Sequence, residues 1–571
     1  MKTIIRSLLA IAVLASPLVG CSKKEGDSTP QQKIAPATLL DEQLLQKIPN
    51  SSAGFIVMDF AGEGYKKFSS SPWANDVQGL SAIKSAVDEL QSNGATEEQV
   101  KVAKTLLDSL QKLGLVSADG KSQVDKVLSG AVAYVAVQQT GEPPADIGVF
   151  VRAASGTSIS DRVATLRQIL TEAGLKVTDQ KIGDAQGFSA QFPSSDDDGE
   201  DKIDVFIHVA GTADKLGIAF TKSALEGLFG SSPTSGLANL KSLPEFSKAE
   251  DSVRLSETPL SFAFVSVKAL APIFEPEEGE PANDFSVKDS PLAAIALSQA
   301  YAGQMVTSAG IVVAPTNDTQ KSVISAFEGS GLPSTAFKLP ADTALSLSLD
   351  ARVLGKLETV LKSLDDPSAG MVLQQIKDIQ GVTLGLRNGD GSSPVPDVYL
   401  AVDSSARDQV ATSLETGIGL GMMAAGQQMQ WLSKEISGNP TRYFLTPLGV
   451  GVYVSSPKNS NSLVVATSER AVADISAASS GASLDTSMSR SLRDAVTAAT
   501  TAGSLYMNFI QLGNLIDSVK GTVASMIGPN PELDQAIDSS RLKKLGIGIG
   551  SLSYANGVFK IQSVVERVEP R

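Results

Sequence analysis

The chain has 571 residues but only one histidine, His208, and one cysteine, Cys21. Zinc, haem and copper sites in proteins draw mainly on several His or Cys side chains, so the sequence argues against all three. A disulfide needs a second cysteine, which the chain lacks. His208 lies in Asp204-Val-Phe-Ile-His-Val, a pattern that predicts a strand, and we interpret it as a structural residue of a sheet.

Signatures of hydrolytic enzymes are also scarce. The chain has no Gly-x-Ser-x-Gly elbow. Ser81 and Lys84 have the Ser-x-x-Lys spacing of penicillin-binding enzymes, but no Lys-Thr-Gly follows, and Ser540 and Lys543 repeat the spacing. We therefore predict a chain that is not an enzyme. A pair of carboxylates acting on a polysaccharide stays open as a less favoured alternative.

Basic residues are too few to balance the acidic ones. Forty-eight Lys and Arg face 62 Asp and Glu, a net charge of −14. This balance argues against a nucleic-acid partner and against binding anionic lipid head groups by charge. Two acidic segments, residues 196–201 and 275–284, have the oxygen-rich composition of calcium-binding loops. An EF-hand register from Ser194 places Val205 where a bidentate Glu is needed, so we expect solvated loops and no metal.

Long hydrophobic runs are missing as well. Residues 8–19 form an apolar run that follows Lys2 and Arg6. The run is too short to span a membrane and is typical of a secretory signal peptide. Beyond Val19, charges, Pro or Gly interrupt every apolar stretch within a few turns.

The run ends in Leu18-Val19-Gly20-Cys21, which resembles the lipobox of bacterial lipoproteins. The resemblance implies that residues 1–20 are removed as a signal peptide. It also implies that Cys21 carries a diacylglycerol and an N-acyl chain, with no other cofactor. Ser22 is not the aspartate that is associated with retention in the inner membrane. The resemblance therefore implies an outer-membrane lipoprotein that faces the periplasm or the cell surface.

Residues 21–38 are polar and contain too few apolar side chains to offset the entropy of ordering them. We predict that they form a flexible tether between the lipidated Cys21 and the folded part of the chain. The lipid would then hold the protein at the membrane while the folded part moves over its surface.

The remaining chain carries an internal repeat. Segments of the first half match segments of the second half in the same order: 130–151 with 381–402, 161–165 with 408–412, 216–225 with 463–472, 261–267 with 503–509, and 310–313 with 546–549. Residues 53–59 match 344–350 at a larger offset, so the first half has an insertion, near residues 71–125. Its apolar residues keep helical spacing, which predicts helices.

From this repeat we predict an α+β fold of two tandem homologous domains, residues 39–335 and 336–571. Each is expected to hold a mainly antiparallel sheet covered by helices on one face. Leu345, Leu347 and Leu349 alternate with polar residues, which favours a sheet with one covered and one wet side. We expect the leucines on the covered side.

One predicted helix, residues 407–436, carries small residues at every fourth position, namely Gly417, Gly421 and Ala425. Small residues allow another element to approach closely. The strip has two interpretations, packing of the helix on the sheet, or a seam for a partner or an apolar ligand.

These patterns leave two classes of function. The favoured one is a lipid-anchored, non-catalytic interaction or scaffold protein of the cell envelope, which contacts the membrane through its lipid and binds an envelope protein. The alternative is a carrier or binding protein for a lipid or another apolar ligand. An envelope hydrolase is the third and least favoured reading.

Overall fold

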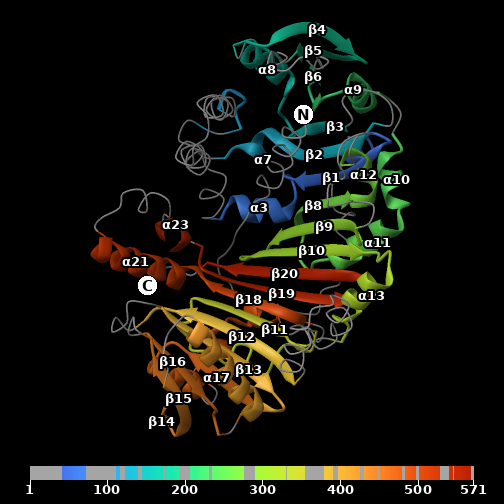
Figure 1. Ribbon diagram of the computed structural model, residues 1–571. Coiled ribbons are helices and arrows are strands. Elements are labelled where there is room, and N and C mark those ends of the chain that lie inside the picture. Colours follow the sequence, from blue (N-terminus) through green and yellow to red (C-terminus); the bar gives the residue numbers. More distant parts are fainter. Residues whose placement is uncertain are drawn as a thin grey trace. The chain divides into compact units, whose positions relative to one another are not determined.

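The computed structural model describes residues 42–71, 111–115, 117, 122–138, 145–172, 174–191, 206–230, 234–274, 290–329, 331–353, 378–389, 396–424, 430–446, 450–458, 460–478, 483–494, 496, 501–527, 539–543 and 545–567 (Figure 1). Cys21, Ser81, Ala425, both acidic segments and most of the insertion near residues 71–125 lie outside this part. The chain divides into a first unit that ends at Ala314 and a second unit that begins at Pro315. The predicted boundaries of the homologous domains stay predictions.

The first unit is built on an antiparallel sheet. Its strands run in the order β10-β9-β8-β1-β2-β3-β7-β6-β5-β4, and each neighbouring pair is antiparallel. Their bounds are β1 (Ser52–Asp59), β2 (Leu128–Val137), β3 (Ala145–Ala153), β4 (Lys176–Ile182), β5 (Ala185–Gln191), β6 (Phe206–Gly211), β7 (Lys215–Ala219), β8 (Pro259–Ser266), β9 (Leu292–Tyr301) and β10 (Met305–Val313).

The helices of the first unit are α2 (Glu42–Leu45), α3 (Glu63–Ser69), α7 (Val124–Val127), α8 (Ser160–Glu172), α9 (Lys222–Phe229), α10 (Gly236–Lys241), α11 (Pro244–Ser252) and α12 (Val267–Phe274). They cover both faces of the sheet. Phe246 of α11 packs on Phe264 of β8 at 4.7 Å between ring centroids. Val265, the next residue of β8, packs with Leu270 of α12. Consecutive strand residues point to opposite faces, so the prediction of helices on one face alone does not hold.

The second unit has its own antiparallel sheet, with the strand order β20-β19-β18-β11-β12-β13-β17-β16-β15-β14. Place for place, this is the order of the first unit. The bounds are β11 (Leu345–Asp350), β12 (Ile379–Arg387), β13 (Asp397–Ser404), β14 (Leu432–Ile436), β15 (Asn439–Leu445), β16 (Gly451–Ser455), β17 (Ser462–Ala466), β18 (Thr501–Asn508), β19 (Ile547–Ala555) and β20 (Val558–Glu566).

The helices of the second unit are α13 (Asp318–Ser325), α17 (Arg407–Ala424), α18 (Glu469–Ala478), α19 (Leu484–Ser487), α20 (Arg490–Asp494), α21 (Phe509–Ile527) and α23 (Ser539–Lys543). In the chain, α17 follows β13 as α8 follows β3, and α21 follows β18 as α12 follows β8. No helix of the described residues is both long and apolar enough to cross a membrane.

Two details of the sequence prediction are wrong. The predicted helix 407–436 does not reach its predicted end, because its last five residues form β14. Ser437 and Gly438 take φ angles of 50° and 79°, so the chain turns there and pairs β14 with β15. Residues 310–313 lie on β10, whereas 546–549 lie at the start of β19. These strands hold different places in the two orders, because the counterpart of β10 is β20.

The centre of each sheet holds a tyrosine that lies over a glycine of the neighbouring strand. Tyr134 of β2 faces Gly148 of β3, and Tyr399 of β13 faces Gly385 of β12. Since β12 corresponds to β2 and β13 to β3, the tyrosine and the glycine lie on opposite members of the strand pair in the two units. A Cβ atom on Gly148 would come within 2.5 Å of the Tyr134 hydroxyl. Glycine at these places leaves room for the rings.

We expect Gly148→Ala to lower the free energy of unfolding by about 1–3 kcal/mol, because the added methyl group forces Tyr134 out of its place. Urea denaturation measures the change. The control is Gly417→Ala on α17, where no atom lies within 4 Å of the new methyl group. That variant should gain about 0.5–1 kcal/mol from the better helix propensity of alanine. Equal effects of the two substitutions would contradict the packing described here.

Candidate functional site

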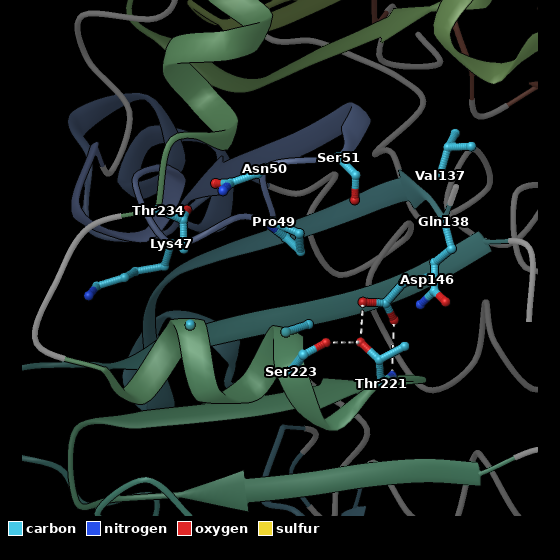
Figure 2. A pocket seen from close by; sticks show the side chains of 12 residues that line it. Lys47, Pro49, Asn50, Ser51, Val137, Gln138, Asp146, Thr221, Ser223 and Thr234 are labelled. Carbon is cyan, nitrogen blue, oxygen red and sulfur yellow. Dashed lines mark hydrogen bonds between the residues drawn. The ribbon is translucent and has the colours of Figure 1, made fainter. Parts of the chain in front are cut away.

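A pocket of about 640 Å³ opens in the first unit, where β2 ends, β3 begins and α9 starts (Figure 2). The segment before β1 forms its other wall, and hydrogen bonds tie that segment in place. The Asn50 side chain accepts a hydrogen bond from the Ser235 N–H at 2.7 Å. The backbone carbonyl of Asn50 accepts one from the side-chain amide of Asn239 at 3.1 Å. The lining residues are Lys47, Pro49, Asn50, Ser51, Val137, Gln138, Asp146, Thr221, Ser223, Ala224, Gly227 and Thr234.

Asp146 is the buried acid of this pocket, with 3% of its surface exposed. One carboxylate oxygen accepts from the backbone N–H groups of Phe220 and Thr221, both at 3.1 Å. The other accepts from the Thr221 hydroxyl at 2.7 Å and the Tyr134 hydroxyl at 3.1 Å. The carboxylate therefore holds the turn that leads from β7 into α9.

Burial raises the pKa of Asp146 above its usual value, and the hydrogen bonds from Thr221, Tyr134 and Phe220 offset part of this rise. Burial, followed by the charge of Asp146, raises the pKa of Tyr134 as well. A buried acid with a shifted pKa in a pocket marks a candidate site. The four donors to Asp146 come from the protein itself, so the acid has a structural task. Other lining groups, such as Ser51 and Gln138, provide hydrogen bonds for a polar ligand.

The corresponding place in the second unit holds a network of charges. Asp397 occupies the place of Asp146 in the strand order, and it pairs with Arg387, which is 1% exposed. The Arg387 guanidinium lies 3.1 Å from Asp397, 3.3 Å from Asp342 and 2.8 Å from Asp474. The register partner of Asp146 is Ala136, so the first unit has no such arginine.

Several exposed apolar residues gather on one face of β11 and the strands around it. Leu347 of β11 lies directly beside Leu384 of β12 and Leu505 of β18, and these three are 38%, 41% and 38% exposed. Leu349, two residues along β11, is 45% exposed. We call this surface the leucine face, and define it as Leu347, Leu349, Leu384, Val398, Leu505 and Ile561.

Helix α17 covers another part of the same sheet face. Its Val410 packs with Val402 of β13, and the register places Val402 on the face that carries Leu349. The helix thus lies over β13 and β17 and leaves the leucines of β11, β12 and β18 exposed.

The opposite face of β11 is polar and buried. Ser346, Ser348 and Asp350 are between 0% and 3% exposed. Ser348 accepts a hydrogen bond from Thr383 at 3.1 Å, and Asp350 binds the Arg352 guanidinium at 2.7 Å. The expectation that Leu345, Leu347 and Leu349 lie on the covered side is therefore wrong. Alternation sorts the side chains into two faces, but helices elsewhere in the chain decide which face they cover.

The first unit has smaller side chains at the positions that correspond to the centre of the leucine face. The counterpart of Leu347 is Ile56 of β1, whose neighbours are Ala133 of β2 and Ala263 of β8. All three are only partly exposed. The large exposed leucines are thus a property of the second unit.

Gly417, Gly421 and His208 neither line the pocket nor belong to the leucine face. Gly417 and Gly421 are on the exposed side of α17, with no atom within 4 Å of the place of a Cβ, so they do not pack on the sheet. Leu420 and Met423 beside them are exposed. His208 lies on β6 as predicted and is half-buried. Its Nδ1 shares a hydrogen bond of 2.8 Å with Gln180, and burial lowers its pKa.

Within the described residues, no three His, Cys, Asp or Glu side chains gather as a metal site would require. Sequence reasoning also missed the buried role of Asp146. The signal that could have found it is the alignment of Asp146 with Asp397 in the repeat, because a shared acid at the start of a strand indicates a common task.

No protein-family model matches the chain, and no curated protein matches it. Among solved structures, crystal form III of TP0453 has a TM-score of 0.24 at 10% identity, covering 51% of this chain and 88% of that one. Crystal form IV of TP0453 has a TM-score of 0.23 at 11% identity, covering 49% and 83%. At these scores the likeness is weak and carries no argument about function.

The raised pKa of Asp146 predicts a pH dependence. The folded state holds this proton more tightly than the unfolded chain, where the pKa is about 3.9. The contribution of Asp146 to stability is therefore fully present below that pH and is lost as the pH rises through the folded pKa. Relative to Asp146→Asn, which does not titrate, the wild type should lose stability as the pH rises from the unfolded-state pKa of about 3.9 through the higher folded-state pKa. A pH-independent or rising difference in urea denaturation would contradict this.

The charge network predicts a large effect of Arg387. We expect Arg387→Met to lower the free energy of unfolding by about 3–5 kcal/mol, since it leaves the buried Asp397 without its cation. Lys543→Met is the control, because Lys543 forms a more exposed pair with Asp517 and should change stability by about 0–1 kcal/mol. Chemical denaturation compares both variants with the wild type. A loss at Arg387 no larger than that at Lys543 would show that the network is not stabilising.

Proposed function

We propose that the chain is a bacterial lipoprotein whose residues 1–20 are removed and whose Cys21 is acylated. In this proposal it stays at the outer membrane and acts as a non-catalytic interaction or scaffold module for an envelope protein. The observation that carries the proposal is the leucine face, which provides a binding surface on the second unit.

The leucine face has the character of a binding surface. Contiguous exposed apolar patches on soluble domains often mark sites of interaction. Neighbouring leucines on adjacent strands have Cβ atoms about 4.5–5.5 Å apart, so they form one surface rather than isolated contacts. Burial of such a surface removes apolar area from water and so favours binding, before the entropic costs of association are subtracted. Binding through this face therefore needs no catalytic group.

We also propose that the two units arose by internal duplication. The repeat in the sequence and the common strand order support this, as do helices that follow corresponding strands. After the duplication the two copies diverged at the central places of the exposed face, where Ala133 and Ala263 correspond to Leu384 and Leu505. We assign the interaction to the second unit for this reason.

A carrier of an apolar ligand is the alternative that uses the same leucines. A protein partner is favoured because the leucines are spread over a sheet face, and a broad apolar face suits a broad partner surface. The pocket of the first unit is lined largely by polar side chains, so it suits an apolar ligand poorly.

The test is photo-crosslinking in living cells, with a photoreactive amino acid placed at Leu384 of the full-length protein. We expect a protein adduct at Leu384 and none at Leu445, a control residue that is even more exposed, at 61%. An adduct with lipid alone would favour the carrier. The absence of any adduct at Leu384 would overturn the proposed interaction.

Membrane fractionation of the same cells tests the anchor. We expect the wild type in the outer-membrane fraction and Cys21→Ala outside it, because the variant lacks the residue that is acylated. Equal membrane association of both would contradict lipidation at Cys21.

A further inference from the structure

Two buried hydroxyl groups in the second unit have no partner. Ser346 of β11 and Ser504 of β18 are 1% and 4% exposed. Among the described residues, neither hydroxyl has a hydrogen-bond partner. Buried hydroxyl groups in proteins nearly always form a hydrogen bond, to protein or to ordered water. We call these two residues the serine pair.

The serine pair is arranged so that one small molecule can reach both hydroxyls. In the register, Ser346 faces Tyr506 and Ser348 faces Ser504, so Ser346 and Ser504 are diagonal neighbours on one sheet face. Diagonal residues on adjacent antiparallel strands are about 7–8 Å apart at their backbones and closer at their side chains. Two hydrogen bonds of about 2.8 Å through a shared oxygen span this gap.

Neighbouring hydroxyl groups on the same face do have partners. Thr335 shares a hydrogen bond of 3.1 Å with Thr383, and Thr383 donates to Ser348 at 3.1 Å. Ser504 lies directly beside Ser348 in the register. The hydrogen-bonded hydroxyl groups of Thr335, Thr383 and Ser348 thus lie next to the serine pair. Among the described residues, the network does not continue to the pair itself.

In the first unit, apolar side chains occupy the positions that correspond to the serine pair. Phe55 and Phe262 are the counterparts of Ser346 and Ser504, with the same diagonal register. Their rings meet edge to face at 5.8 Å, and they are 3% and 0% exposed. Serine is far smaller than phenylalanine, so the second unit has replaced two packed rings with two short polar groups.

We propose that the serine pair binds an ordered internal water molecule, which donates to or accepts from both hydroxyls. A water molecule supplies the missing partners and occupies part of the space that two rings fill in the first unit. Water is the ligand that this chemistry selects, because the site is polar and offers at least two hydrogen-bonding groups. This site is on the opposite sheet face from the leucine face, so it is independent of the proposed interaction.

The test is magnetic relaxation dispersion of water, measured on the chain from Cys21 onward, produced without its lipid. We expect the long-lived water signal of the wild type to fall by the contribution of one molecule in Ser346→Ala/Ser504→Ala. Each single variant should weaken the same signal, because the two hydroxyls share one molecule. Circular dichroism confirms that the variants fold, and a crystal structure of the wild type should show density within hydrogen-bond distance of both hydroxyl oxygens.

The matched control is Ser308→Ala in the first unit. Ser308 is 0% exposed, but its hydroxyl already donates to the Ser252 carbonyl at 3.4 Å. This variant should leave the water signal unchanged. The proposal is overturned if the double variant retains the full signal, or if the wild-type crystal structure shows no density between Ser346 and Ser504.

Discussion

Alternation of side chains along an antiparallel strand is the constraint on which the second unit depends. Leu345 to Asp350 reads Leu-Ser-Leu-Ser-Leu-Asp, so every leucine must lie on one face and every polar residue on the other. The structure covers the polar face. The leucines are then exposed, and the serines and the aspartate need hydrogen bonds within the protein. The exposed leucine face and the buried polar face of β11 thus have the same origin.

The two units satisfy this constraint in different ways. In the first unit helices cover both faces, with packed rings such as Phe55 and Phe262 on one and Ala133 and Ala263 on the other. In the second unit serine replaces the rings and leucine replaces the alanines. The acid at the start of the third strand is kept, but Asp146 binds backbone and hydroxyl donors, whereas Asp397 binds Arg387. One framework therefore accepts either aromatic or polar side chains on the covered face of its opening strand.

Much of the framework is readable from the sequence. The paired hairpins, the opening strands and the helix starts near Asp161 and Asp408 are where the repeat places them, because local alternation and capping determine such elements. The covered face is not readable in this way, since it depends on helices distant in sequence. Residues 432–436 are a strand and not the end of a helix, because pairing of β14 with β15 overrides the helical pattern. Three of the four donors to Asp146 come from Phe220 and Thr221, more than 70 positions away, and no local pattern reveals them.

The measurement that tests the account most directly is the labelling rate of single engineered cysteines at adjacent residues of β12. Cys21 is the only native cysteine, and Cys21→Ser removes it from the purified chain. In cells, the proposed acylation would block its thiol. The account predicts that Leu384→Cys reacts readily in the purified folded protein and is protected in intact cells, where a partner covers the leucine face. It predicts that Thr383→Cys stays unreactive in both. Equal labelling of the two cysteines in the folded protein, or no protection of Leu384→Cys in cells, would contradict it.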